Sequence, residues 1–561
     1  MPPGAPWLAH YDAGVRPALE YPARTLLDYL AEHARDRPAA PALLYKGATV
    51  TYGGLQAASD AFACALRALG VARGDRVGLL LPNCPQFLIA EIGAWKIGAI
   101  AAPINPSYTE AEIEGPLRDL GVETVVVLTR FYGRVKAIQP RTPVRRVIAT
   151  SIKEYFPAHL RVLFTLLRER GSGDRVTLAP GDSDFAHLLL VNRGRRPPPP
   201  PVTPDDPAIL LLSGGTTGTP KAAAGRHSAY VCAGLQVQEW LASVLSGNDV
   251  HCLPLPLFHV YANVGVQSLA IINGDALSLV PNPRDVDDLV ATLRRVKPSF
   301  FTGVPALYIA LLKHAAVVAG KIDFKSIKLC VSGASALLAE TRARFESLTG
   351  GRIVEGYSLT EAMMALVVNP VRGENKAGSV GMPLPDVLVR VVDAEDGTRE
   401  LDRNDVGEIA IAAPQLMQGY WGQAGETQQM LREDGAGRRW LYTGDLGYLD
   451  ADGYLFIVDR KKDLIKTSGF QVWPREIEEV LAAHPAVGEV GVAGVPDPVR
   501  GEVVKAWVVL RADTGATDGE LRAFCRERLA GYKVPATVEF RTELPKTMVG
   551  KVMRRALRED G

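Results

Sequence analysis

Hydrophobic and polar positions follow two different patterns along the first part of the chain. Over residues 51–69 apolar side chains recur three or four positions apart, which predicts an amphipathic helix. Residues 75–82 and 122–128 are short, β-rich apolar runs, and this predicts buried strands. Helical spacing returns over residues 87–97. Strands that alternate with helices in this way indicate parallel α/β layers.

A second pattern occupies the C-terminal part of the chain. It predicts helices over residues 476–483 and 521–529, and strands over 487–495 and 503–510. This is typical of a small α+β domain. We place its boundary in the charged turn at residues 459–463, which divides the chain into residues 1–461 and 462–561.

Between these regions the chain changes character. Residues 155–168 (YFPAHLRVLFTLLR) combine an apolar face with His159, Arg161 and Arg168. The stretch is interpreted first as an ordinary surface helix, and alternatively as a peripheral membrane contact that helps to collect a lipid substrate. Five consecutive prolines, residues 197–201, predict a stiff, solvated connector.

Charge and cysteine content exclude several classes of protein but do not identify one. The chain has 561 residues with 63 basic and 62 acidic side chains, a net charge of +1, so charge alone attracts neither nucleic acid nor an anionic membrane. Its six cysteines form no C-x-x-C pair, which disfavours a zinc site or a disulfide framework. There is no signal-peptide pattern and no uncharged run of the roughly 18–20 residues that span a bilayer. We therefore expect a cytoplasmic protein.

The most informative motif is the glycine-rich run SGGTTGTPK at residues 213–221, which follows a strand-like segment. Glycines let backbone N–H groups turn toward a phosphate, hydroxyls add further donors, and the lysine adds positive charge. The run is not a Walker A motif, because Pro220 precedes the lysine and Ala222 follows it. The candidate phosphate-binding residues are Ser213, Gly214, Gly215, Thr216, Thr217, Gly218, Thr219 and Lys221.

This loop resembles that of the adenylate-forming superfamily, which includes acyl-CoA synthetases, and further motifs in the family's order extend the resemblance over nearly the whole chain. PLPLFHVY at residues 254–261 is similar to a segment in which His259 borders the reacting carboxylate. EGYSLTE at residues 355–361 resembles G-Y-G-x-T-E, with serine at 358 where glycine is commonest. The resemblance implies that Gly356 and Tyr357 contact adenine, that Thr360 contacts the α-phosphate, and that Glu361, with Thr216, binds Mg²⁺.

The remaining motifs complete the nucleotide site and the second domain. YTGD at residues 442–445 and DR at 459–460 imply that Asp445 and Arg460 bind the ribose. Lys462 takes the place of the family's hinge. Lys466, Gly469 and Gln471 lie in a stretch similar to the loop that makes the thioester. Near the C-terminus, Lys551 resembles the mobile lysine of adenylation, whereas Arg554 is interpreted as part of a basic tail.

The resemblance implies a fold and a reaction. The fold is α/β: a large N-terminal domain of layered subdomains with a β-barrel-like part, and a small mobile α+β C-terminal domain. ATP and Mg²⁺ convert a carboxylic acid to an acyl-AMP, and coenzyme A then takes the acyl group. Lys551, Thr216, Glu361 and His259 are the catalytic candidates, acting by positioning and charge stabilisation rather than as a nucleophile.

The substrate stays open among several alternatives. Residues 440–462 and 468–474 are similar to fatty acyl-CoA synthetases, which favours a medium- or long-chain fatty acid. An aryl acid such as 4-coumarate is the close alternative, and an acyl-AMP ligase that loads a separate carrier protein is another. An idle nucleotide-binding module, a luciferase-like oxygenase and a homodimeric assembly are also considered. Nucleic acid is not an expected partner.

Overall fold

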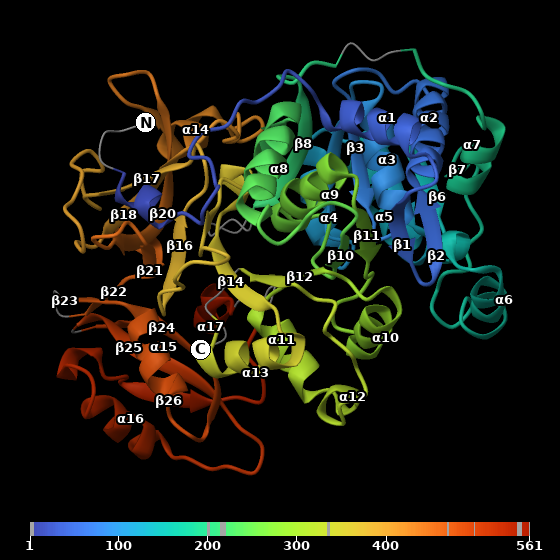
Figure 1. Cartoon of the computed structure of the whole chain (residues 1–561). Helices are drawn as coiled ribbons and strands as arrows, with labels where there is room; N and C mark the ends of the chain where they lie inside the picture. The colour runs from blue at the N-terminus through green and yellow to red at the C-terminus, as the bar shows by residue number, and fades with distance from the viewer. Residues whose placement is uncertain are drawn as a thin grey trace.

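The computed structural model describes residues 5–198, 202–213, 220–333, 337–467, 470–498, 500–546 and 552–559. Three β-sheets organise the described chain (Figure 1). Two large sheets with their helices form the N-terminal domain, and a five-stranded sheet forms a small C-terminal domain at the lower left of the view. The α/β class predicted from the sequence is confirmed.

The first sheet has seven strands and is parallel except for the last pair. Its central strands are buried on both faces: Leu79 packs toward α2 and α3, whereas Leu80 packs toward α4 and α5. This explains the nearly continuous apolar runs in the sequence. In spatial order the strands are β7 (Ser183–Asp184), β6 (Arg146–Thr150), β5 (Thr124–Leu128), β3 (Arg76–Leu80), β4 (Ile100–Pro103), β8 (Pro207–Ser213) and β9 (Lys221–Arg226).

Local signals explain where several helices begin. The Thr51 side chain accepts a hydrogen bond from the Gly54 backbone at the start of α2, and Thr109 with Glu112 forms a capping box on α4. The helices of this half are α1 (Leu26–Asp36), α2 (Tyr52–Ala68), α3 (Pro85–Trp95), α4 (Glu110–Asp119), α5 (Thr129–Ile138), α6 (Ala158–Leu167), α7 (Phe185–Val191) and α8 (His227–Leu241).

The second sheet has 14 strands, and one half of it is parallel. This half extends from the hairpin of β1 and β2 to β14, which ends at Tyr357. Its strands, in spatial order, are β14 (Arg352–Tyr357), β13 (Leu329–Ser332), β12 (Phe300–Gly303), β10 (Val250–Leu253), β11 (Ala276–Leu279) and β1 (Pro41–Tyr45), followed by the antiparallel β2 (Ala48–Thr51). The connecting helices are α9 (Ser268–Asn273), α10 (Val286–Val296), α11 (Pro305–Lys313), α12 (Ala315–Val318) and α13 (Ala339–Thr349).

The other half of this sheet is antiparallel, and it corresponds to the part predicted to be β-barrel-like. Its strands pair one after another, from β14 outward to β17. The strands are β15 (Val367–Val368), β16 (Ser379–Pro383), β21 (Leu455–Arg460), β20 (Arg439–Leu449), β18 (Gly407–Ala412) and β17 (Leu388–Val392), with β19 (Leu431–Glu433) beside β20 and α14 (Ala424–Met430) preceding it.

The C-terminal domain has its own apolar core around Ile477, Leu481 and Val508. Its strands are β23 (Phe470–Val472), β22 (Ile465–Thr467), β25 (Gly501–Leu510), β24 (Val487–Asp497) and β26 (Thr537–Phe540), and its helices are α15 (Pro474–Ala482), α16 (Asp518–Arg526) and α17 (Arg554–Glu559). The structure thus contains the helices and strands that periodicity predicted here. None of the described helices is both long and apolar enough to cross a membrane.

Candidate active site

The candidate site lies where parallel strands end. Ser213 ends β8, the segment of residues 254–259 follows β10, and Tyr357 ends β14. Since β10, β12, β13 and β14 run parallel, their carboxyl ends meet at one edge of the sheet. In open α/β sheets this edge is the usual place for a ligand.

Glu361 is a buried carboxylate held by a tyrosine that sequence reasoning missed. Tyr420 donates its hydroxyl hydrogen to Glu361 Oε1 at 2.7 Å, and only 9% of Glu361 is exposed. Tyr420 reaches this position because residues 418 and 421 pair with β9 through the backbone. No signal in the sequence QGYW distinguishes such a tyrosine from one that packs in the core. The second carboxylate oxygen of Glu361 accepts no hydrogen bond from the described residues, and it is the atom available to a cation.

Ser213 and Lys221 gather around the same tyrosine. Lys221 Nζ lies 5.4 Å from the centre of the Tyr420 ring and 2.6 Å from Glu426 Oε2 on α14. Ser213 is 7% exposed, and its hydroxyl donates to the Lys221 carbonyl at 3.2 Å. One end of the glycine-rich loop is therefore tied to the other, beside Glu361.

A second polar group joins Tyr357, Asp445 and Arg460. Residues 445 and 460 are cross-strand partners in β20 and β21, which places Arg460 Nε 3.0 Å from Asp445 Oδ1. Tyr357 donates to Asp445 Oδ2 at 2.7 Å. Burial, together with the adjacent carboxylate, raises the pKa of Tyr357 well above its usual value, so its hydroxyl keeps its proton. Three residues predicted from separate motifs thus form one connected group.

His259 lies two residues before Tyr261, which lines an apolar pocket. Burial lowers the pKa of His259 to about 4, so the imidazole is neutral at pH 7 and its Nδ1 accepts from the Tyr261 backbone at 3.3 Å. The π-helical turn η4 (Tyr261–Gln267) follows at once. The pocket has aromatic, aliphatic and methionine walls, including Trp240, Tyr261, Gly265, Leu269, Phe300 and Met364.

Other predicted positions differ in their surroundings. Gly356 and Thr360 are half-buried at the end of β14 and the start of η5 (Thr360–Ala362). The Lys466 side chain is exposed on β22, and its backbone N–H donates to Glu502. His227, the first residue of α8, is 2% exposed and packs edge-on against Trp95, which is the environment of a core residue.

Several predicted residues lie outside the described residues, so their roles stay predictions. They are Gly214, Gly215, Thr216, Thr217, Gly218, Thr219, Gly469 and Lys551, together with the side chain of Gln471.

Arg554 is the clearest residue that sequence reasoning misjudged. Instead of belonging to a solvated tail, its side chain is 16% exposed and contacts three carboxylates. Its guanidinium lies 2.7 Å from Asp459, 3.2 Å from Asp463 and 2.7 Å from Glu478. Asp459 directly precedes Arg460, and its side chain is 2% exposed. The C-terminal helix is therefore tied to the strand that carries the Asp445 group.

A buried carboxylate network supports the turn beside His259. Glu91 on α3 is fully buried and accepts hydrogen bonds from Asn263 at 2.7 Å and Gln267 at 2.6 Å. Asn263 in turn accepts from the Tyr230 hydroxyl at 2.5 Å. Burial raises the pKa of Glu91 to about 7, although the two amide donors oppose the shift. Two residues of the π-helical turn are thus hydrogen-bonded to a titratable carboxyl group.

Glu91→Gln is expected to flatten the pH dependence of stability. The folded pKa exceeds the unfolded value of about 4.5, so between these values the folded state binds the proton and the unfolded state does not. Stability contributed by Glu91 therefore falls as pH rises from about 4.5 to about 7, by about 3 kcal/mol. Thermal unfolding at pH 5.5 and 7.5 should show a smaller loss in Glu91→Gln than in the wild type. Equal losses would exclude Glu91 as the titrating group.

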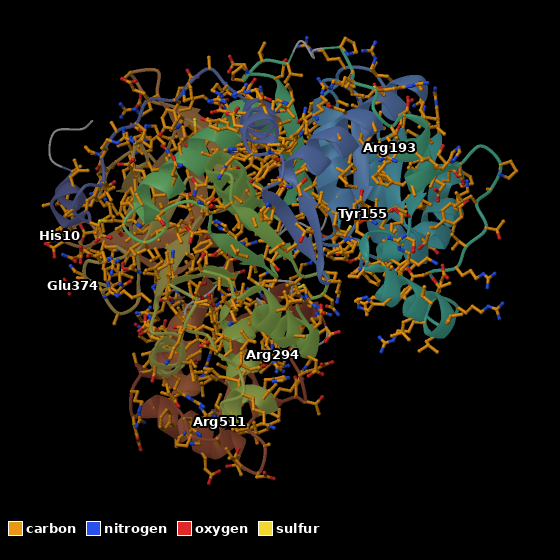
Figure 2. All side chains as sticks on the ribbon, turned by 45° about the vertical axis from the view of Figure 1, so that its right-hand side comes forward. His10, Tyr155, Arg193, Arg294, Glu374 and Arg511 are labelled. Carbon is orange, nitrogen blue, oxygen red and sulfur yellow. The ribbon has the colours of Figure 1, made fainter. Side chains whose placement is uncertain are left out.

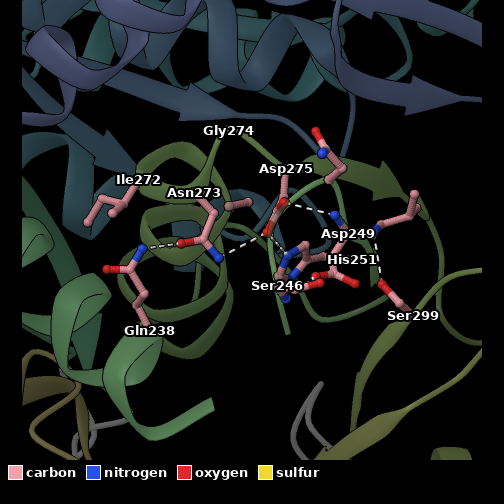
Figure 3. Close-up of polar contacts among 12 residues, drawn as sticks. Gln238, Ser246, Asp249, His251, Ile272, Asn273, Gly274, Asp275 and Ser299 are labelled. Atoms are coloured by element: carbon pink, nitrogen blue, oxygen red, sulfur yellow. Dashed lines mark hydrogen bonds and ion pairs between the residues drawn. The ribbon is translucent and has the colours of Figure 1, made fainter. Parts of the chain in front are cut away.

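A second buried cluster, outside this site, is drawn in Figure 3. His251 Nε2 lies 2.8 Å from Asp275 Oδ2, and Asn273 donates to the same carboxylate at 3.0 Å. His251 and Asp275 are 0% and 1% exposed. Because His251 is near the start of β10, this cluster lies at the opposite end of the strand from His259. Its hydrogen bonds join the start of β10 to the start of β11.

Comparisons with known proteins agree with this arrangement. The model of the AMP-binding enzyme family matches residues 30–421, and the model of the AMP-binding enzyme C-terminal domain matches residues 476–551. The chain belongs to the AMP-binding enzyme family. This AMP-binding enzyme is 37% identical to a long-chain-fatty-acid–CoA ligase of Bacillus subtilis, covering 99% of the chain and 98% of that protein. It is 32% identical to 4-coumarate–CoA ligase 2 of Oryza sativa over 97% of the chain and 93% of that protein.

Solved structures match the AMP-binding enzyme over nearly its whole length. ATP-bound MatB from Rhodopseudomonas palustris superposes with a TM-score of 0.81 at 28% identity, covering 96% of this chain and 99% of that one. The apo form of the same protein, with the same identity and coverage, gives 0.71. The TM-score is therefore higher for the ATP-bound form than for the apo form.

Proposed function

We propose that this AMP-binding enzyme is an ATP-dependent fatty acyl-CoA ligase. It activates a medium- or long-chain fatty acid to acyl-AMP with release of pyrophosphate, and then transfers the acyl group to coenzyme A with release of AMP. The observation that supports a fatty acid as substrate is the apolar pocket lined by Tyr261, whose walls suit an alkyl chain. Full-length similarity to long-chain-fatty-acid–CoA ligases supports the same substrate.

In the first step the chain's own groups position the nucleotide. Asp445 and Arg460 would hold the ribose hydroxyls, with Tyr357 fixing the carboxylate by its hydrogen bond. Lys221 and Ser213 would contact the β- and γ-phosphates, and Lys221 would exchange Glu426 for them. The neutral His259 would border the acid's carboxylate without competing for it as a cation.

Mg²⁺ fits the one carboxylate oxygen that Tyr420 leaves available on Glu361. Within the described residues there is no cluster of three or more acidic, histidine or cysteine ligands. This suits an ion that takes one or two carboxylates and completes its shell with substrate phosphates and water. Bound there, with Thr216 as the second proposed ligand, Mg²⁺ would offset charge on the phosphates. Tyr420 would keep Glu361 oriented toward it.

The second step would use a different face of the C-terminal domain. We place the hinge at Lys462, between residues 1–461 and 462–561, where β21 ends and η6 (Lys461–Asp463) begins. In the present arrangement Lys551 would serve adenylation. Rotation about the hinge would withdraw it and bring Lys466, Gly469 and Gln471 to the pantetheine path. The closer match to ATP-bound MatB supports assignment of this arrangement to the first step.

The test is pyrophosphate release with ATP, Mg²⁺ and coenzyme A across acids from acetate to palmitate, with benzoate and 4-coumarate included. We expect turnover to peak on medium or long alkyl chains, because they bury the most apolar surface against the apolar walls of the pocket. A peak on 4-coumarate would overturn the substrate but keep the mechanism. Transfer of the acyl group to the thiol of a carrier protein, with release of AMP and without coenzyme A, would overturn the ligase assignment. So would ATP binding without turnover of any acid.

A further inference from the structure

Helix α6 presents its apolar side chains to solvent instead of to the core. Val162, Leu163, Leu166 and Leu167 are 59%, 52%, 76% and 72% exposed, and no residue of the helix is buried. Their spacing places all four on one stripe. Figure 1 shows α6 projecting from the outer edge of the seven-stranded sheet, far from the C-terminal domain. The exposed stripe is called the α6 face below.

The opposite face of the helix is anchored, so the α6 face cannot turn inward by a simple roll. Phe164 packs edge-on against Phe156, with ring centres 5.7 Å apart. Lys153 Nζ contacts Thr165 at 2.9 Å and Glu169 at 2.7 Å. Arg161 donates to the backbone carbonyls of residues 154 and 156. These contacts fix which side of α6 meets solvent.

The charges that border the α6 face have one sign. Over residues 155–175 the exposed charged side chains are arginines, namely Arg161, Arg168, Arg170 and Arg175. Two acidic residues follow α6, and both have partners. Glu169 pairs with Lys153, and the buried Asp174 accepts hydrogen bonds from Thr129 and Ser172. Figure 2 shows side chains with nitrogen ends that extend into solvent from the segment after Tyr155. The patch is therefore both apolar and cationic.

We propose that the α6 face docks on an anionic lipid bilayer. Val162, Leu163, Leu166 and Leu167 would enter the interface, while Arg168, Arg170 and Arg175 would contact headgroup phosphates. A second copy of the chain fits less well, because a two-fold contact through this face would oppose arginines to arginines. The docking itself does not depend on the proposed ligase activity. If that activity holds, docking would let the enzyme collect fatty acids that are dissolved in the membrane.

The experiment is sedimentation of the full chain with phosphatidylglycerol or phosphatidylcholine vesicles. We expect binding to phosphatidylglycerol that weakens between about 100 and 500 mM NaCl, and little binding to phosphatidylcholine. The double variant Leu166→Glu with Leu167→Glu should lower the partition coefficient about tenfold or more, because it places charge in the inserted stripe. Arg168→Gln with Arg170→Gln should weaken binding and reduce its salt dependence.

Val318→Glu is the matched control, because Val318 is 69% exposed on another helix, α12. This variant should bind vesicles like the wild type. All variants should keep the wild-type melting temperature and the turnover of a water-soluble acid such as hexanoate. Absence of wild-type binding to phosphatidylglycerol at low salt, or equal binding by the leucine double variant, would overturn the proposal. A dimer that the same double variant dissociates would assign the face to a second copy. Loss of turnover on every acid, with vesicle binding intact, would instead refute only the ligase function.

Discussion

Arg554→Met is expected to slow acyl-AMP formation about a hundredfold, and to leave thioester formation from supplied acyl-AMP within a few-fold of normal. Arg554 bridges Asp459, on the N-terminal side of the proposed hinge, to Asp463 and Glu478 on its C-terminal side. Breaking a buried ion pair leaves uncompensated carboxylates and costs several kcal/mol. The loss destabilises the present arrangement of the two domains more than the rotated one, because rotation about Lys462 would separate Arg554 from Asp459 in any case. Pyrophosphate release and coenzyme A acylation should be measured separately.

Two further variants separate a contact across the hinge from support within the small domain. Asp459→Asn weakens the contacts of Asp459 across the hinge, with Arg554 and with the backbone N–H of Arg475, and should share the selective loss of the first step. Glu478→Gln weakens a pair within the C-terminal domain, and should lower its stability while affecting both steps alike. The opposite assignment of effects would mean that Arg554 only supports the small domain.

Asp445→Asn is expected to lower kcat/KM for ATP about a hundredfold, with the KM for the acid little changed. The change removes the charge that Arg460 neutralises and replaces an acceptor of the Tyr357 hydroxyl. Hydrogen bonds to charged groups contribute about 1.5–3 kcal/mol each, and a ribose diol would use two of them. Initial rates with ATP varied at saturating acid give the two parameters.

A carboxylate of the neighbouring turn provides the control for Asp445. Asp450 follows β20 and pairs with Lys376 at 2.6 Å, outside the site. Asp450→Asn should lower the melting temperature modestly without a specific change in the KM for ATP. A similar rise in the KM for ATP in both variants would show that loss of stability, rather than loss of a ribose contact, explains the effect of Asp445→Asn.

The sequence predicted what depends on local periodicity and on ordered motifs. The runs at residues 75–82 and 122–128 became β3 and β5, because strands buried on both faces need apolar side chains at every position. Tyr357, Asp445 and Arg460 were each chosen from a separate motif, and the structure brings them within hydrogen-bonding distance.

What the sequence did not reveal depends on tertiary contacts between distant residues. Tyr420 reaches Glu361 only because residues 418–421 join the edge of β9. Arg554 is one of several adjacent basic residues, and its three acidic partners lie 76 to 95 positions earlier. Glu91 sits inside a continuous apolar pattern, and its partners Asn263 and Gln267 lie more than 170 positions away. Periodicity carries no information about such pairs.

The N-terminal segment makes its contacts with residues that are synthesised much later. Asp12 accepts backbone hydrogen bonds from Arg372 and Gly373, and Trp7 packs against Gly453. At ribosomal rates, the 360 residues between Asp12 and Arg372 take roughly 20 to 70 seconds to make. During that time the segment has emerged without its partners. This segment therefore reaches its place only after residues 372, 373 and 453 have been made, long after its own synthesis.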